Sequence, residues 1–89
     1  MRLISQNHRA DVNYDQVYLI ACRNKLGLFT IVAFDYSGNK IGTMAEYKNK
    51  EDAESAFDGV TSLVSNFFSN GSVYIFPEDK LSDENEGDI

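Results

Sequence analysis

A histidine and a cysteine are the residues of this chain whose chemistry is most typical of nucleophilic catalysis. The sequence holds one imidazole, His8, and one thiol, Cys22. A nucleophile needs a base beside it and a third group that orients the base. His8 lies among polar residues typical of a turn, and Cys22 lies in an apolar run. We therefore expect a solvated histidine and a cysteine that packs as a small hydrophobe, and we do not expect an enzyme.

Metal ligands and phosphate-binding loops are not indicated by the sequence pattern. The chain has no CxxC or HxxxH spacing, so the clustered ligands of a metal site are not predicted. Its glycines are scattered rather than gathered in a loop that cradles phosphate. We therefore expect no metal and no cofactor.

Three arginines near the start of the chain are suited to recognising an anion. They are Arg2, Arg9 and Arg23. A planar guanidinium group binds phosphate through two hydrogen bonds at once, so one interpretation is a pocket for a small nucleotide signal, built by two protomers. The other interpretation is three ordinary surface arginines. Direct binding to a long nucleic acid is not predicted, because the basic residues form no stripe.

Acidic and aromatic residues are candidates for binding a protein partner. Acids at the start of the predicted helix would steer the chain toward a basic groove of a host protein. A host protein that binds nucleic acid would have such a groove. Tyrosines in a turn and at a strand end are expected to be exposed, where aromatic side chains serve as interface anchors. The candidates are Glu51, Asp52, Glu54, Asp58, Tyr36 and Tyr47.

The net charge of the chain is concentrated at its C-terminal end. The sequence has 14 acidic and 8 basic residues, a formal net charge of −6. Residues 78–89 hold 6 acids and 1 base, which leaves 8 acids and 7 bases for residues 1–77. We expect a single domain over 1–77 and a disordered acidic tail over 78–89, because the tail has too little apolar surface to offset the entropy of ordering.

Removing the acidic tail should leave the fold intact. A chain that lacks residues 79–89 is expected to melt within a few degrees of the full-length protein, because the tail contributes almost no apolar area to a core. Thermal unfolding followed by circular dichroism measures the difference. A much lower melting temperature would show that the tail docks on the domain.

Hydrophobic periodicity and turn residues indicate several strands and one helix. Short loops between the strands favour antiparallel pairing. Apolar residues at spacings of three and four, after the N-cap residue Asn49, predict an amphipathic helix over 50–68. Close packing against the sheet would explain Gly59 inside this helix. The predicted strands are 2–5, 17–22, 28–34, 40–47 and 73–76, with 11–14 as either a separate short strand or the lead-in to 17–22.

The order β-β-β-β-α-β predicts an α+β fold, with one helix on one face of an antiparallel sheet of about five strands. The strands over 17–22 and 28–34 are apolar on both faces, and one helix covers only one of them. We therefore expect a homo-oligomer that covers the second face. The residues expected at this contact are Tyr18, Ile20, Val32 and Phe34.

Three segments of the chain resemble a known group of proteins. Residues 4–7 (Ile-Ser-Gln-Asn) and 11–17 (Asp-Val-Asn-Tyr-Asp-Gln-Val) are similar to the opening of short uncharacterised proteins of Firmicutes and their phages. His8 stands where that pattern has glycine, and Asn13 stands where it has proline. Residues 44–47, before the helix, also look like that family. The resemblance implies an accessory protein of a phage or mobile element, and it implies no particular chemistry.

These features favour a non-enzymatic accessory protein that binds and inhibits a host protein, such as a component of CRISPR or restriction immunity. Two alternatives stay open: an oligomeric sponge for a small nucleotide signal, and a structural or regulatory protein unrelated to defence. No apolar run in the sequence approaches the ~20 residues of a membrane span. With no visible signal peptide, we expect a protein of the bacterial host cytoplasm that does not bind membranes.

Overall fold

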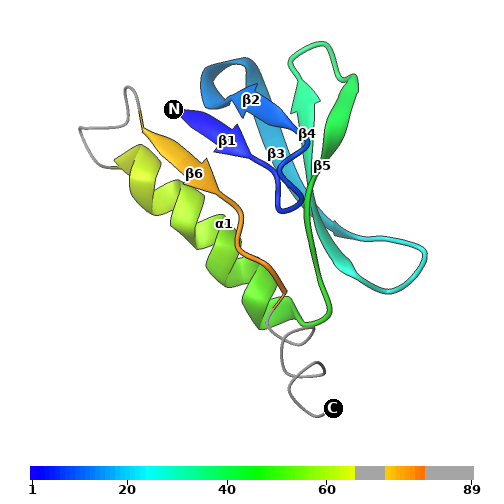
Figure 1. The fold of residues 1–89 in the computed structure, drawn as a ribbon. Helices are drawn as coiled ribbons and strands as arrows, with labels where there is room; N and C mark the ends of the chain where they lie inside the picture. Colours follow the sequence, from blue (N-terminus) through cyan, green and yellow to red (C-terminus); the bar gives the residue numbers. More distant parts are fainter. Residues whose placement is uncertain (66–71, 80–89) are drawn as a thin grey trace.

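The computed structural model describes residues 1–65 and 72–79 of the chain. In these residues, two three-stranded sheets are present, with strand orders β2-β1-β6 and β3-β4-β5. The helix α1 runs beside them and packs against β4, β5 and β6 (Figure 1). The elements are β1 Arg2–Ile4, β2 Asp11–Asn13, the 3₁₀ helix η1 Tyr14–Gln16, β3 Val17–Arg23, β4 Phe29–Asp35, β5 Lys40–Tyr47, α1 Lys50–Ser65 and β6 Val73–Ile75.

The predicted α+β fold with one helix is confirmed, but the single sheet of about five strands is wrong in detail. Strand β1 lies between β2 and β6, and it pairs antiparallel with β2 but parallel with β6. The chain also turns between β2 and β3, where the Asn13 side chain accepts a hydrogen bond from the Asp15 backbone N–H at 3.1 Å. The strands therefore form two sheets, because β1 pairs with β6 and does not add to the β3–β4–β5 meander.

Two polar side chains shape the turns of this meander. Asn24 accepts hydrogen bonds from the backbone N–H groups of Leu26 and Leu28, at 2.9 and 3.0 Å. Asp35 does the same for Ser37 and Asn39 in the next turn, at 3.0 and 2.9 Å. Each turn also contains a glycine with positive φ, 81° at Gly27 and 91° at Gly38. Such a backbone carries little steric cost for glycine alone, so both turns follow from local sequence.

The helix begins where its sequence predicts. The Asn49 side chain accepts a hydrogen bond from the Asp52 backbone N–H at 2.8 Å, as an N-cap residue does. Ala53, Ala56 and Val60 are the buried residues of the helix. The helix is described only to Ser65, so its predicted end at residue 68 lies outside the described residues.

The hydrophobic core joins α1 to residues of both sheets. Leu3, Ile31 and Ala33 have no exposed surface. The other buried core residues are Met1, Val17, Met44, Ala45, Tyr47, Ala53, Ala56, Val60 and Phe76. This set takes residues from β1, β3, β4, β5 and α1 and from Phe76 after β6, so the two sheets form one core.

Gln6 connects the two sheets through hydrogen bonds. Its backbone N–H donates to the Met44 carbonyl at 2.7 Å. Its side-chain oxygen accepts from the Glu46 backbone N–H, and its side-chain nitrogen donates to the carbonyl groups of Glu46 and Pro77, all at 3.1 Å. One side chain therefore ties β5 to the segment after β6.

Backbone strain is present at His8, which lies in the exposed turn between β1 and β2. Its φ is 63°, a left-handed conformation that costs a residue with a side chain roughly 1–2 kcal/mol. The turn is held by the His8 N–H, which donates to the Ser5 carbonyl at 2.8 Å, and by the Arg9 N–H, which donates to the Asn7 side chain at 3.0 Å. Glycine, which the resembled pattern has at this position, would adopt the same φ without that cost.

The segment after β6 is described as far as Asp79. The Asp79 carboxylate accepts a hydrogen bond from the Lys48 backbone N–H at 3.2 Å, so contacts with the domain reach two residues beyond Pro77. The remainder of the predicted acidic tail, 80–89, lies outside the described residues. Within the described residues, no helix is both long and apolar enough to cross a membrane.

Candidate functional site

Three aromatic side chains gather on the face of the β3–β4–β5 sheet that points away from α1. Along each strand, side chains alternate between the two faces, so Ile31 and Ala33 enter the core while Tyr18 and Phe34 lie on the other face. The Tyr18 and Phe34 rings stack with centroids 5.5 Å apart and planes 15° apart. The Tyr36 ring lies 6.0 Å from Tyr18. We call Tyr18, Phe34 and Tyr36 the aromatic cluster.

The aromatic cluster is open to solvent beside a hydrogen-bonded turn. Tyr36 is 70% exposed and Tyr18 is 36% exposed. Tyr36 sits in the turn that the Asp35 carboxylate organises. The backbone N–H of Asn39, with smaller contributions from other hydrogen bonds of this turn, lowers the pKa of Asp35. The carboxylate therefore supports the turn above the ordinary Asp pKa, and its support is lost as the pH falls through the lowered value.

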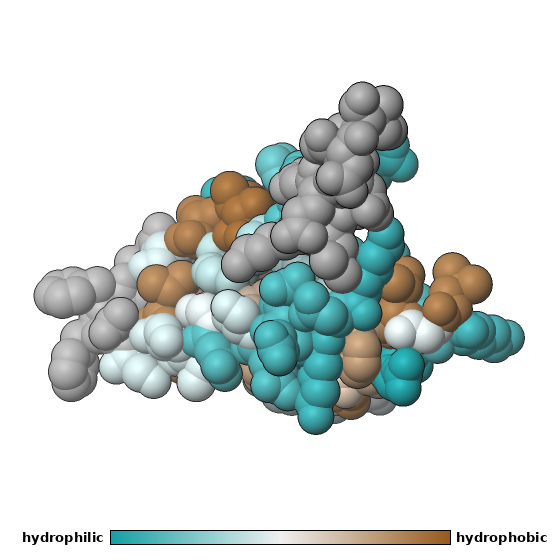
Figure 2. All heavy atoms as spheres, turned by 90° about the horizontal axis from the view of Figure 1, so that it is seen from below, coloured by the Kyte–Doolittle hydropathy of each residue, from teal (hydrophilic) through white to brown (hydrophobic). Residues whose placement is uncertain are grey.

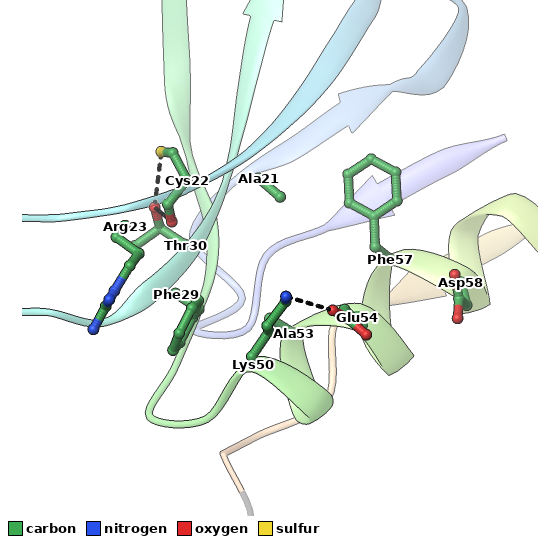
Figure 3. Close-up of a pocket in the computed structure, with 10 residues that line it drawn as sticks. All are labelled: Ala21, Cys22, Arg23, Phe29, Thr30, Lys50, Ala53, Glu54, Phe57 and Asp58. Atoms are coloured by element: carbon green, nitrogen blue, oxygen red, sulfur yellow. Dashed lines mark hydrogen bonds and ion pairs between the residues drawn. The ribbon is translucent and has the colours of Figure 1, made fainter.

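A groove of about 520 Å³ lies between the end of β3 and the first half of α1 (Figure 3). Its apolar lining comes from Ala21, Phe29, Ala53 and Phe57, and Phe57 points from the helix toward β3 in the close-up. The small Ala21 on the strand and Ala53 on the helix leave this space between the two elements. The remaining lining residues are Cys22, Arg23, Thr30, Lys50, Glu54 and Asp58.

The charges at this groove are mixed. The Arg23 guanidinium lies over the Phe29 ring, 4.9 Å from its centroid, on the strand side. On the helix side, Lys50 and Glu54 form an exposed ion pair with an N–O distance of 3.6 Å, and Asp58 adds a second carboxylate. The two cations, Arg23 and Lys50, are balanced by Glu54 and Asp58, so the groove has no excess positive charge to attract phosphate and favours apolar side chains.

A second hollow, of about 220 Å³, continues along β3 toward its start. Phe57 borders both hollows. The second hollow is more polar, since tyrosines and a threonine contribute to it. Its other lining residues are Tyr14, Val17, Tyr18, Leu19, Tyr36, Val60 and Thr61. Figure 2 shows a different view of the surface, in which hydrophilic residues occupy the middle and hydrophobic patches lie toward either side.

The residues predicted to bind a protein partner differ in exposure and lie on different elements. Tyr36 is exposed as expected, but Tyr47 is 1% exposed, so its predicted exposure is wrong. The Tyr47 hydroxyl donates to the Pro77 carbonyl at 2.7 Å, and burial raises its pKa. Tyr47 is buried because the chain after β6 returns over the end of β5. The four predicted acids are all on α1, in the turns nearest its start, where Asp52 is half-buried and Glu51, Glu54 and Asp58 are exposed.

The residues predicted for self-association do share the face away from α1. Tyr18 and Ile20 are 36% and 41% exposed, and Phe34 is half-buried. Val32 is only 6% exposed, so it cannot contribute much area to a contact. Its register explains this burial, because Val32 lies between Ile20 on β3 and Thr43 on β5, whose side chains flank it.

The three arginines are placed in different parts of the fold. Arg2 on β1 forms an ion pair with Asp11, whose hydrogen bond raises the pKa of Arg2 and lowers that of Asp11. Arg9 is exposed in the turn between β1 and β2, and Arg23 lines the groove at the end of β3. The nucleotide pocket stays a hypothesis, and the ion pair of Arg2 weakens it.

The thiol and the imidazole lie on separate elements. Cys22 is exposed, so its expected role as a buried hydrophobe is wrong. Its Sγ lies 3.3 Å from the Thr30 hydroxyl on β4. Cys22 is exposed because β3 forms the edge of its sheet, which sequence periodicity does not reveal. His8 is exposed in its turn, and in the described ranges 1–65 and 72–79 no group of three or more His, Cys, Asp or Glu residues is arranged to hold a metal ion.

Comparison with known proteins assigns no relative. No family model matches the sequence, and neither a curated protein nor a solved structure is significantly similar to it. The functional argument therefore depends on the aromatic cluster and on the surface between β3 and α1.

Proposed function

We propose that this protein is a non-enzymatic accessory protein of a phage or mobile element that binds and inhibits a host protein. The aromatic cluster carries this proposal. Tyrosine is enriched among the residues that dominate binding energy at protein interfaces. A ring that is already stacked loses little conformational freedom on binding, and the Tyr18 ring is held against Phe34 at 5.5 Å.

The target class follows from the resemblance to phage proteins, which makes a component of CRISPR or restriction immunity the first candidate. The acids of α1 lie on the helix side of the sheet, whereas the aromatic cluster lies on the other side. A contact through the aromatic cluster is largely apolar, so its affinity should change little with salt. A contact through Glu51, Glu54 and Asp58 should weaken steeply as salt rises.

Phage plating in cells with one defined CRISPR or restriction system tests this function. Expression of the protein should raise the plating efficiency of a targeted phage, and Tyr36→Ala and Tyr18→Ala should each abolish much of this gain. Truncating an interface anchor costs about 2 kcal/mol, or roughly 30-fold in affinity. Leu26→Ala is the matched control, because Leu26 is 83% exposed in the β3–β4 turn and lies outside the aromatic cluster.

The same variants distinguish the alternatives. Protection that survives both tyrosine variants but is lost in Glu54→Lys and Asp58→Lys would place the contact on α1. A purified protein that binds a cyclic nucleotide, and loses it in Arg23→Ala, would favour the nucleotide sponge. Unchanged plating across representative CRISPR and restriction systems would argue against a role in defence.

A further inference from the structure

Strand β3 is an edge of its sheet within the part of the chain that the structure describes. The Asn24 N–H donates to the Leu28 carbonyl at 3.0 Å. This bond shows which residues of β3 direct their backbone N–H and C=O groups toward β4. Even-numbered residues of β3 therefore bond to β4, and Leu19 and Ala21 direct their N–H and C=O groups away from it. Val17 fits this alternation, because its N–H donates to the Tyr14 carbonyl instead.

Among the residues that the structure describes, nothing gives this edge the usual protection against pairing with another strand. Natural edges carry inward charges, proline or bulges, or are covered by another element. The seven residues of β3 read Val-Tyr-Leu-Ile-Ala-Cys-Arg, with one charge at the end. Residues 20–23 are all exposed, and the β3–β4 register has no bulge.

We infer that β3 of a second copy of this chain pairs antiparallel with β3 and forms a symmetric dimer. The two-fold axis passes between the two Ile20 residues, so Leu19 lies opposite Ala21 of the second copy. Leu19 and Ala21 then exchange both main-chain hydrogen bonds, since both direct these groups outward. This register uses the whole of β3, and the inference does not depend on the proposed function.

Side-chain size favours this register. On the helix side of the sheet, Ala21 borders the apolar groove, and Leu19 of the second copy would lie directly beside it. Leu19, which packs partly against the core of its own copy, would thus border the space beside the small Ala21 of the other copy. Arg23 of the second copy lies opposite Val17, which borders the more polar hollow with Tyr14 and Thr61. Both hollows along β3 would thus receive side chains suited to their linings.

Charge also favours antiparallel pairing of two copies over parallel pairing. Asp15 precedes β3, and Asp35 lies beside Val17 in the β3–β4 register. Arg23 and Lys25 lie at the opposite end of β3. In an antiparallel pair, the acidic end of each copy meets the basic end of the other, whereas a parallel pair would place like charges together.

The dimer would leave the stacked rings of Tyr18 and Phe34 on the face away from α1, although Tyr18 and Tyr36 also border the hollow that Arg23 of the second copy would enter. A two-fold axis perpendicular to the sheet keeps both helices on one side and both aromatic clusters on the other. Ile20, now 41% exposed, would lie against its counterpart. This inference places self-association at the edge of the sheet, whereas the sequence predicts it on the face.

Cross-linking through position 20 tests the register. Residues directly opposite in a non-hydrogen-bonded pair have Cα atoms about 4.5 Å apart, within the range of a disulfide. The variant Ile20→Cys/Cys22→Ser is expected to form a disulfide-linked dimer on mild oxidation, at twice the chain mass of 10.0 kDa. Ile41→Cys/Cys22→Ser is the matched control and should form no disulfide-linked dimer, because Ile41 is 48% exposed but lies on β5, away from the β3–β3 contact. The unmodified chain should not cross-link, since its two Cys22 residues would face Tyr18.

A proline at position 21 tests the pairing itself. Ala21→Pro removes an N–H group that points away from β4, so the domain should stay folded. Sedimentation at tens of micromolar should give a dimer for the parent and for Ala21→Ser, and a monomer for Ala21→Pro with an unchanged circular dichroism spectrum. A monomeric parent without cross-linking at position 20 would overturn the inference. A dimer that persists in Ala21→Pro, or strand pairing only with a different protein, would overturn it as well.

Discussion

Replacing Phe76 with alanine is expected to lower the free energy of unfolding by about 3–5 kcal/mol. Phe76 is 1% exposed and packs edge-on against Tyr74, with ring centroids 5.1 Å apart. Its backbone N–H donates to the Ile4 carbonyl at 3.0 Å, which places the ring in the core beside β1. Removing the ring leaves a cavity where the end of the chain closes the fold.

Chemical denaturation measures this loss, and Ile75→Ala is the matched control. Ile75 precedes Phe76 but is 49% exposed, so its truncation should cost less than about 1 kcal/mol. For a domain of this size, each kcal/mol lowers the melting temperature by roughly 4–8 °C. If Phe76→Ala does not fold, Phe76→Leu should still unfold at lower denaturant than the parent. Equal effects at positions 75 and 76 would contradict the described burial.

Replacing Gly59 with alanine is expected to destabilise the protein, although alanine favours helices. A Cβ atom at this position would lie 2.5 Å from the Tyr74 hydroxyl oxygen and 2.9 Å from two ring carbons. The Tyr74 hydroxyl donates to the Ala56 carbonyl at 3.0 Å, which holds the ring against the helix. Overpacking costs about 1–3 kcal/mol, which outweighs the gain of up to about 1 kcal/mol in helix propensity.

The sign of the effect should depend on Tyr74. In the Tyr74→Ala background, Gly59→Ala should raise the free energy of unfolding, because the clash is gone and the helix propensity remains. Ser62→Ala is the control on the exposed side of α1 and should be slightly stabilising in both backgrounds. A stabilising Gly59→Ala in the native background would show that the ring moves aside at little cost.

Features that depend on contacts within a few residues could be predicted from the sequence. Asn49 caps the helix, and the two turns of the meander form around Asn24 and Asp35, as their sequences indicate. The face assignment of β3 and β4 was also predictable, because side chains alternate strictly along a strand. The close packing expected at Gly59 is confirmed by the Tyr74 ring beside it.

Features that depend on pairing between distant segments were decided by the tertiary structure alone. Periodicity identifies a strand, but it does not identify the neighbour with which that strand pairs. The parallel pairing of β1 with β6 is one case, and the bond from Gln6 to Pro77, 71 positions along the chain, is another. The same cause buries Tyr47 and exposes Cys22. A residue at the end of a strand is buried when another segment crosses it, and an apolar residue on a strand is exposed when that strand becomes an edge.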